Sequence, residues 1–293
     1  MSQHLLDPSW LARLERMQMA TRRLVSGSHA GGRRARQLGS SMEFADYRAY
    51  VPGDDLRQLD WNAYARSGKL FLKKYLDETE LHVTLYIDCS RSMGYGQPGK
   101  MERAVQIAAA LGYLSLCNLD HVSVFAFDSQ ITASLQGLQG KKQAHRLLSF
   151  LSSLKEGGTG DLNTAMRQPG AVHGKSGISI VLSDFLFESG YSPGIAYLQA
   201  ARQEVVLVQV LSQEELQPAY QGELRLIDSE TRQAKEVSVT GLLMEEYRKS
   251  LADYQQELTS FAYGRGITCV AIEAEQTLES IVFQVFRQAG MIR

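Results

Sequence analysis

From Leu81 to the end of the chain, short apolar runs alternate with longer segments of helical spacing. Runs rich in valine, isoleucine and leucine indicate strands at 81–88, 121–128, 131–135 (a short edge partner), 178–185, 204–211 and 267–274. Apolar residues that recur every three or four positions indicate helices at 101–117, 141–154, 193–203, 242–264 and 278–288. This alternation predicts an α/β fold with three layers, in which helices cover both faces of a mostly parallel, doubly wound sheet. Ligands of such sheets bind beyond the carboxyl ends of the strands.

The first eighty residues follow a different pattern. They predict helices at 9–25 and 56–67 and a strand at 69–75, with a loop rich in Gly, Ser and Arg after the first helix. This part of the chain has too few apolar residues for a core of its own. We therefore expect residues 1–80 to be an N-terminal extension packed on a main domain of residues 81–293. Within that domain, the alternating pattern at 222–239 predicts an inserted β-hairpin.

Composition limits the classes of protein to which the chain belongs. The 293 residues are 44% hydrophobic and 22% charged, which is ordinary for a globular protein with a core. The net charge of −1 gives no overall attraction to nucleic acid or to a membrane surface, and it counts against nucleic-acid binding through Arg33, Arg34 and Arg36. The three cysteines lack C-x-x-C spacing, which fits a reducing compartment. Without a signal peptide or a bilayer-spanning apolar stretch, we expect a cytoplasmic protein.

Residues 86–101, YIDCSRSMGYGQPGKM, contain two overlapping motifs. The second half spells G-x-G-x-x-G and G-x-x-x-x-G-K, which are patterns of phosphate-binding loops. A dinucleotide-binding loop begins where its strand ends, but five residues separate Asp88 from Gly94 here. A Walker-type loop needs Ser or Thr after its lysine, and Met101 follows Lys100. We therefore interpret these glycines as a turn.

The first half of the same segment spells D-x-S-x-S and suggests a metal site. Asp88 lies at the carboxyl end of a predicted strand, and alternate residues of an extended segment point the same way, so Ser90 and Ser92 should converge with it. Carboxylate and hydroxyl oxygens suit Mg²⁺ or Mn²⁺. Further oxygens come from Thr159 in the loop GGTGD and from Asp184 after a core strand. A single Asp at a strand end is more often a helix cap, but three converging segments favour a metal site.

In this order, D-x-S-x-S, G-G-T and an aspartate after an apolar strand resemble the metal-ion-dependent adhesion site of von Willebrand factor A domains. The resemblance implies a von Willebrand factor A-like domain from about Leu81 onward. It implies Mg²⁺, or else Mn²⁺ or Ca²⁺, with hydroxyl ligands from the serines and the threonine and with the aspartates acting directly or through water. It also implies that the carboxylate of a protein partner fills the remaining position. The matching residues are Asp88, Ser90, Ser92, Thr159 and Asp184.

The segment 43–80 resembles the signature of a bacterial family, domain of unknown function fifty-eight. Its sequence is EFADYRAYVPGDDLRQLDWNAYARSGKLFLKKYLDETE, and residues 210–218 and 226–233 resemble later segments of the same family. The resemblance implies a partnership with a MoxR-type ATPase of the AAA+ class, with this chain as adaptor or co-chaperone in the assembly or maturation of protein complexes. Some members carry N-terminal membrane helices, which are absent from this sequence.

These resemblances imply a non-enzymatic, metal-dependent protein-interaction module. The alternative is a Mg²⁺-dependent hydrolase or phosphatase on a similar sheet. Phosphoryl transfer by an aspartate would need a second carboxylate two residues after Asp88, and Ser90 stands there. The charges of the segment 43–80 are either a partner-docking surface or, as we expect, a paired network that pins this segment to the main domain.

Overall fold

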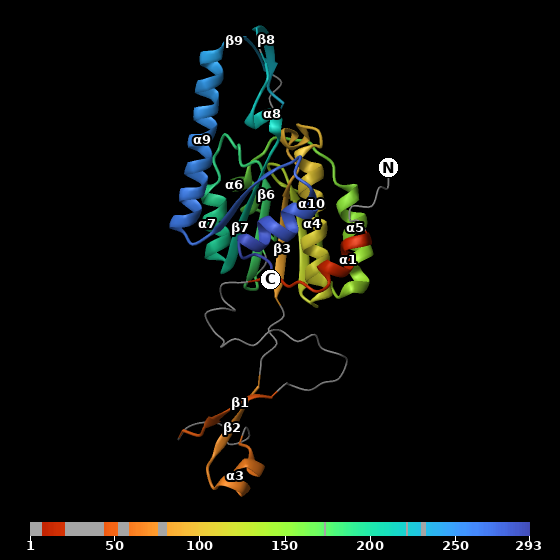
Figure 1. The fold of residues 1–293 in the computed structure, drawn as a ribbon, viewed down its shortest axis with the longest axis vertical. Helices are drawn as coiled ribbons and strands as arrows, with labels where there is room; N and C mark the ends of the chain where they lie inside the picture. The colour runs from red at the N-terminus through yellow and green to blue at the C-terminus, as the bar shows by residue number, and fades with distance from the viewer. Residues whose placement is uncertain are drawn as a thin grey trace. The chain divides into compact units, whose positions relative to one another are not determined.

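A computed structural model describes residues 8–20, 44–51, 59–75, 81–172, 174–220, 222–229 and 233–293. They fall into two compact units (Figure 1). The main unit contains residues 8–20 and the described chain from Leu81 onward, and the second unit lies within His29–Glu80. The expected packing of the N-terminal extension as a whole on the main domain stays a prediction.

The main unit is built around a six-stranded sheet in the order β10-β7-β6-β3-β4-β5. Only β5 runs antiparallel to its neighbour. The mostly parallel sheet predicted from the sequence is thus confirmed. Its strands are β3 (His82–Asp88), β4 (His121–Phe127), β5 (Ile131–Gln139), β6 (Gly177–Ser183), β7 (Gln203–Leu211) and β10 (Thr268–Glu273).

Helices cover both faces of this sheet and complete three layers (Figure 1). One face carries α1 (Pro8–Leu14), α4 (Lys100–Cys117), η3 (Lys141–Gln143), α5 (Ala144–Ser153), α10 (Leu278–Ser280), η4 (Ile281–Val285) and α11 (Phe286–Gln288). The other face carries α6 (Leu162–Met166), α7 (Ser192–Ala200) and α9 (Gly241–Gly264). The predicted helix 278–288 is thus interrupted by the π-helical turn η4.

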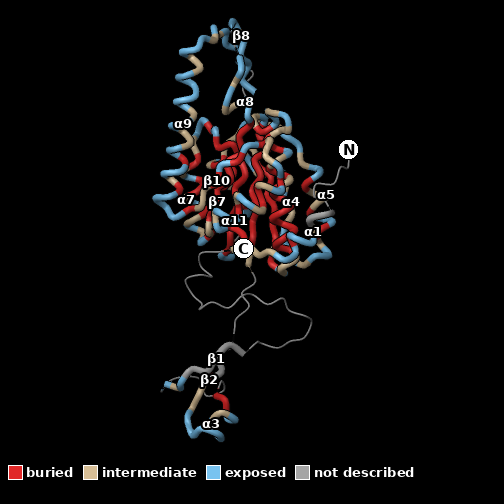
Figure 2. Tube along the Cα trace, viewed as in Figure 1, coloured by how far each residue is buried: buried red, intermediate tan, exposed pale blue. Residues whose placement is uncertain are grey.

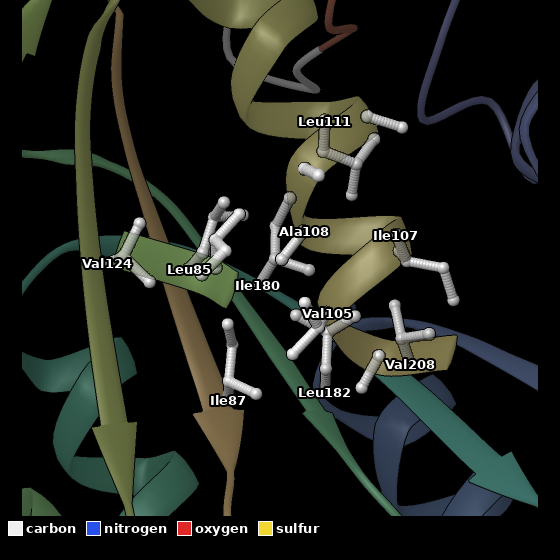
Figure 3. Packing of buried hydrophobic residues seen from close by; sticks show 14 of the residues in the cluster. Leu85, Ile87, Val105, Ile107, Ala108, Leu111, Val124, Ile180, Leu182 and Val208 are labelled. Atoms are coloured by element: carbon white, nitrogen blue, oxygen red, sulfur yellow. The ribbon is translucent and has the colours of Figure 1, made fainter. Parts of the chain in front are cut away.

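Alternation along the strands separates two apolar cores. Leu85 and Ile87 of β3 pack with α4, whereas Tyr86 belongs to the cluster on the opposite face (Figure 3). Helix α4 is rich in alanine and is almost fully buried. A Cβ at its Gly112 would lie 2.7 Å from Cδ2 of Leu147 in α5, so this glycine allows the two helices to pack closely.

We expect Gly177→Ala to lower the free energy of unfolding by about 1–3 kcal/mol, as overpacked substitutions do. A Cβ at this position would lie 2.1 Å from the carbonyl oxygen of His82, which is backbone of the neighbouring strand β3. Urea denaturation measures the change. Gly174→Ala is the matched control because no described atom lies within 4 Å of its Cβ position. Equal unfolding midpoints for the two variants would contradict this close strand contact.

The second unit is a small hairpin with one short helix. Strand β1 (Phe44–Ala49) pairs antiparallel with β2 (Phe71–Tyr75), and α3 (Trp61–Ser67) lies between them in the sequence. The predicted helix 56–67 was too long, because the carboxylate of Asp60 caps the amides of residues 62 and 63. Strand β1 was not predicted. Half of the charged residues in the segment 43–80 lie outside the described residues, so the pairing of these charges stays a prediction.

The predicted helix 9–25 is also shorter in the structure. Helix α1 ends at Leu14, and the residues after it pair with the C-terminus instead of continuing the helix. The amide of Gln18 donates to the carbonyl of Arg293, the amide of Arg293 donates back to Gln18, and the amide of Ala20 donates to the carbonyl of Met291. Tertiary pairing therefore overrides the helical spacing of the sequence.

The predicted insertion is confirmed as the hairpin β8 (Gly222–Ile227) and β9 (Ala234–Val239), joined to β7 through α8 (Gln213–Leu216). Neither the described hairpin nor residues 241–250 of α9 contain a buried residue, and we call these two segments the arm. Figure 2 shows the arm as mostly exposed beyond the buried sheet. Among the described helices, none is both long and apolar enough to cross a membrane.

Candidate metal centre

The order of the strands places a topological switch point between β3 and β6. The chain proceeds from β3 to β4 and β5 on one side and then returns to β6 on the other side of β3. Asp88 is the last residue of β3, and Asp184 follows the last residue of β6. Crevices at such switch points bind ligands in open α/β sheets. The two predicted carboxylates therefore stand at the edge where a ligand site is expected.

The Asp88 carboxylate is fully buried and held on both oxygens. It accepts a hydrogen bond of 2.6 Å from the hydroxyl of Ser183 and one of 2.9 Å from the amide of Ser90. Burial, together with the nearby charge of Asp184, raises the pKa of Asp88 to about 7. A bound cation would relieve this unfavourable burial of negative charge.

The hydroxyl oxygens of Ser90 and Ser92 lie 3.1 Å apart. Adjacent ligands of an octahedral Mg²⁺ ion are about 3 Å apart, so this pair has the spacing of two neighbouring ligands. The expected convergence is present, but its cause differs from the one we inferred. Ser92 lies in the 3-10 turn η2 (Arg91–Gly94) and not in an extended segment.

The two glycine neighbours of Thr159 hold its loop against the segment that contains Ser90 and Arg91. The carbonyl of Gly158 accepts a hydrogen bond of 3.3 Å from the amide of Arg91, and a Cβ at Gly160 would lie 3.2 Å from Cβ of Ser90. Gly158 has a positive φ of 70° and leaves no room for a side chain against Asp128. Thr159 itself is exposed, so it lies on the solvent side of these contacts.

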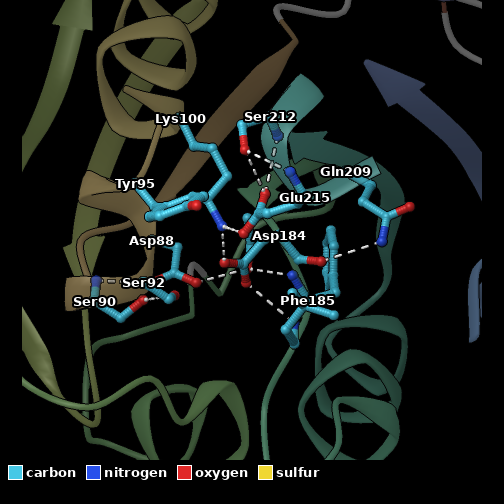
Figure 4. A network of polar contacts seen from close by, with 12 residues as sticks. Asp88, Ser90, Ser92, Tyr95, Lys100, Asp184, Phe185, Gln209, Ser212 and Glu215 are labelled. Carbon is cyan, nitrogen blue, oxygen red and sulfur yellow. Dashed lines mark hydrogen bonds and ion pairs between the residues drawn. The ribbon is translucent and has the colours of Figure 1, made fainter. Parts of the chain in front are cut away.

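Sequence reasoning missed Lys100 as a member of this site (Figure 4). Its ammonium donates hydrogen bonds of 2.7 Å to Asp184 and 2.5 Å to Glu215, and its side chain is 0% exposed. Burial opposes the charged form, but the two carboxylates outweigh it and hold the pKa of Lys100 above its usual range. The ammonium is thus committed to two carboxylates, whereas the lysine of a phosphate loop reaches a nucleotide.

Glu215 connects this site to α8 and to α9, the helix that forms part of the arm. Its carboxylate also accepts a hydrogen bond of 2.9 Å from the amide of Ser212, which completes a capping box at the start of α8. The hydroxyl of Tyr247 in α9 donates to the carbonyl of Glu215 over 3.0 Å. The S-x-x-E pattern SQEE was a sequence signal for α8, but nothing in it indicated a partnership with Lys100.

The residues present fit a hard divalent cation. The described residues contain no cluster of three or more His, Cys, Asp and Glu side chains placed to hold a metal, so an ion here would depend on hydroxyls. The structure offers two serine hydroxyls at ligand spacing, a threonine beside them and two buried carboxylates behind them. Such an oxygen-only set suits Mg²⁺, Mn²⁺ or Ca²⁺.

The solved structures that this chain resembles include two distant matches. BatB from Bacteroides thetaiotaomicron is 16% identical, with a TM-score of 0.39 over 71% of this chain and 98% of that chain. An aerotolerance-related membrane protein from Bacteroides fragilis is 16% identical, with a TM-score of 0.35 over 58% of this chain and 87% of that chain. Both TM-scores lie below 0.5, so the fold rests on the topology described above.

Sequence comparisons give a clearer result. The uncharacterized proteins Mb1516 of Mycobacterium bovis and Rv1480 of Mycobacterium tuberculosis are each 24% identical over 98% of this chain and 92% of their own length. A family described as "Protein of unknown function DUF58" matches residues 46–257. Because this match spans both units and more than half of the sequence, the chain belongs to that family.

Proposed function

We propose that this protein is a non-enzymatic, metal-dependent protein-interaction module. In this proposal Mg²⁺, or else Mn²⁺ or Ca²⁺, binds at the carboxyl ends of β3 and β6, and a partner protein completes the coordination sphere with a carboxylate. The observation that carries the proposal is the pair of serine hydroxyls 3.1 Å apart, beside the buried carboxylate of Asp88. The ion would supply a positive charge that is directed at the partner.

The chemistry of the donor set supports an open position. Three hydroxyls and two carboxylates are one ligand short of the roughly six that Mg²⁺ takes, even if all five bind directly. Asp88 and Asp184 lie on the buried side, whereas Thr159 is exposed. The missing ligand would therefore come from the solvent side. Only the two carboxylates of this set carry negative charge, and Lys100 already pairs with one of them, so a further carboxylate is the favoured newcomer.

The hydrolase alternative receives less support from the same residues. An aspartate nucleophile must reach the phosphorus atom of a substrate, whereas Asp88 is 0% exposed and both of its oxygens already accept hydrogen bonds. Ser90, two residues further, is not an acid–base group at neutral pH. We therefore retain phosphoester hydrolysis only as an outcome that the experiment below would detect.

The resemblance to MoxR-associated proteins suggests the partner. We propose that the carboxylate comes from a cytoplasmic MoxR-type AAA+ ATPase or from its client, and that the protein serves complex assembly as an adaptor or co-chaperone. The arm lies beyond the same edge of the sheet as the candidate metal centre (Figure 1), which provides an exposed surface next to it. A central ion contact together with a surrounding exposed surface matches the hot spot and rim of a protein interface.

We expect Thr159→Ala to weaken both Mn²⁺ binding and partner binding without unfolding the protein. Loss of a central contact should weaken partner binding by at least about 30-fold, the effect of an interface hot spot of about 2 kcal/mol. The measurements are Mn²⁺ titration and binding of the MoxR-type ATPase of the same organism, each with Mg²⁺ or with a chelator. Thr259→Ala in α9 is the matched control because this threonine is also exposed.

Two results would count against the proposal. If Thr159→Ala binds Mn²⁺ and the ATPase as the unaltered protein does, the adhesion-site mechanism is wrong here. If the protein hydrolyses phosphate esters with Mg²⁺ and Thr159→Ala abolishes that turnover, the site belongs to a hydrolase.

A further inference from the structure

We propose that Lys100 is an affinity-determining residue of the candidate metal centre: its ammonium competes with the divalent ion for Asp184, and Glu215 takes up the ammonium when the ion binds. This inference rests on the proposed function because it presupposes a divalent ion at this edge of the sheet. It assigns to Lys100 and Glu215 a role that neither the D-x-S-x-S motif nor the aspartate after β6 contains.

The first observation is that one carboxylate of the site already has a cation. The ammonium of Lys100 lies 2.7 Å from Oδ2 of Asp184, and both side chains are almost completely buried. The other oxygen of Asp184 accepts a hydrogen bond of 3.0 Å from the amide of Leu186. An ion that approaches Asp184 therefore meets a fixed positive charge with little water to screen it.

The second observation is that the ammonium has another acceptor, which comes from α8 and is not one of the five candidate ligands. Glu215 lies 2.5 Å from the same nitrogen, and the capping box of α8 fixes its position. Lys100, Asp184 and Glu215 together carry a net charge of −1, so a single ammonium serves two carboxylates. When an ion binds Asp184, the ammonium of Lys100 keeps its ion pair with Glu215 and is therefore not left as an isolated buried charge.

This arrangement has a consequence for ion binding. Competition with Lys100 keeps the ion weakly held until another carboxylate arrives, so the ion and an acidic partner bind better together than separately. A purely structural role for the Lys100 ion pairs would affect folding but would leave the affinity for the ion unchanged. The two roles therefore differ in a quantity that can be measured on the isolated full-length protein.

The test is Mn²⁺ binding, followed by the electron paramagnetic resonance signal of free Mn²⁺. We expect Lys100→Met/Glu215→Gln to bind Mn²⁺ at least about tenfold more tightly, since it removes the competing cation and keeps the net charge of the trio. Glu215→Gln alone should weaken Mn²⁺ binding, because the ammonium then depends on Asp184. Lys142→Met/Glu257→Gln, at two exposed positions outside the arm, is the matched control and should change nothing.

The outcomes separate this inference from the proposed function. Unchanged or weaker Mn²⁺ binding by the folded double variant overturns the role of Lys100, and so does unchanged or tighter binding by Glu215→Gln. If neither the unaltered protein nor the folded double variant binds Mn²⁺, the metal centre itself is absent, and both proposals fall. Thermal unfolding verifies that each variant is folded. Glu215→Gln alone decides the question if the double variant does not fold.

Discussion

Lys100→Ala is expected to lower the free energy of unfolding by about 3–5 kcal/mol, the usual cost of removing one partner from a buried ion pair. The substitution leaves Asp184, which is only 1% exposed, without its cation. Among the described residues it also removes the only ion pair of Glu215. It also removes a side chain that fills a fully buried volume at the start of α4. Denaturant unfolding followed by circular dichroism measures the difference.

The control for this prediction is Lys249→Ala, which removes an exposed lysine from α9. A surface substitution of this kind should change stability by less than about 0.5 kcal/mol. Because the chain has two compact units, the transition to compare is that of the sheet and not the total signal. A loss below about 1 kcal/mol for Lys100→Ala would mean that the trio is hydrated and that the pairs are worth as little as surface ion pairs.

A second large effect is expected for Leu85→Ala, at about 2–5 kcal/mol of unfolding free energy. Leu85 is 0% exposed at the centre of β3, and a Cβ at Gly112 of α4 would lie 3.4 Å from its Cδ1 (Figure 3). Neighbours on both the sheet and the helix limit the collapse of the resulting cavity.

Leu242→Ala is the matched control for the core substitution, since Leu242 is 75% exposed at the start of α9. The same number of methyl groups is removed, but almost no buried apolar area is lost. Similar unfolding midpoints for the two variants would show that the contact between β3 and α4 is not the tight packing described here.

The central sheet was predictable because its strands carry their own signature. β3 and β6 have no exposed residue, so both faces need side chains that can be buried, and runs rich in Val, Ile and Leu follow from that requirement. The positions of Asp88 and Asp184 were predictable for a related reason, because a carboxylate at the end of such a run lies at the edge of the sheet. The role of the five candidate residues as metal ligands stays a prediction.

Lys100 and the end of α1 were not predictable, because both depend on contacts distant in the sequence. The two carboxylates that pair with Lys100 lie 84 and 115 residues further along the chain, and no local sequence pattern links them to the lysine. Residues 15–20 leave the helical path because Gln18 pairs with Arg293 at the opposite end of the chain. Strand β1 combines alternating charges with aromatic residues, which is a weak signal for an isolated hairpin.

The pairing of the two chain ends makes the main unit discontinuous in sequence. Leu14 and Met19 are buried in the same core as β3 and α4, yet the whole second unit separates them from Leu81 in the chain. The second unit is therefore an insertion between two parts of one folding unit and not a detachable prefix. Trimming the gene from its start to codon 80 would strip two core side chains from the sheet domain. An internal excision that joins residue 20 to Leu81 would preserve them.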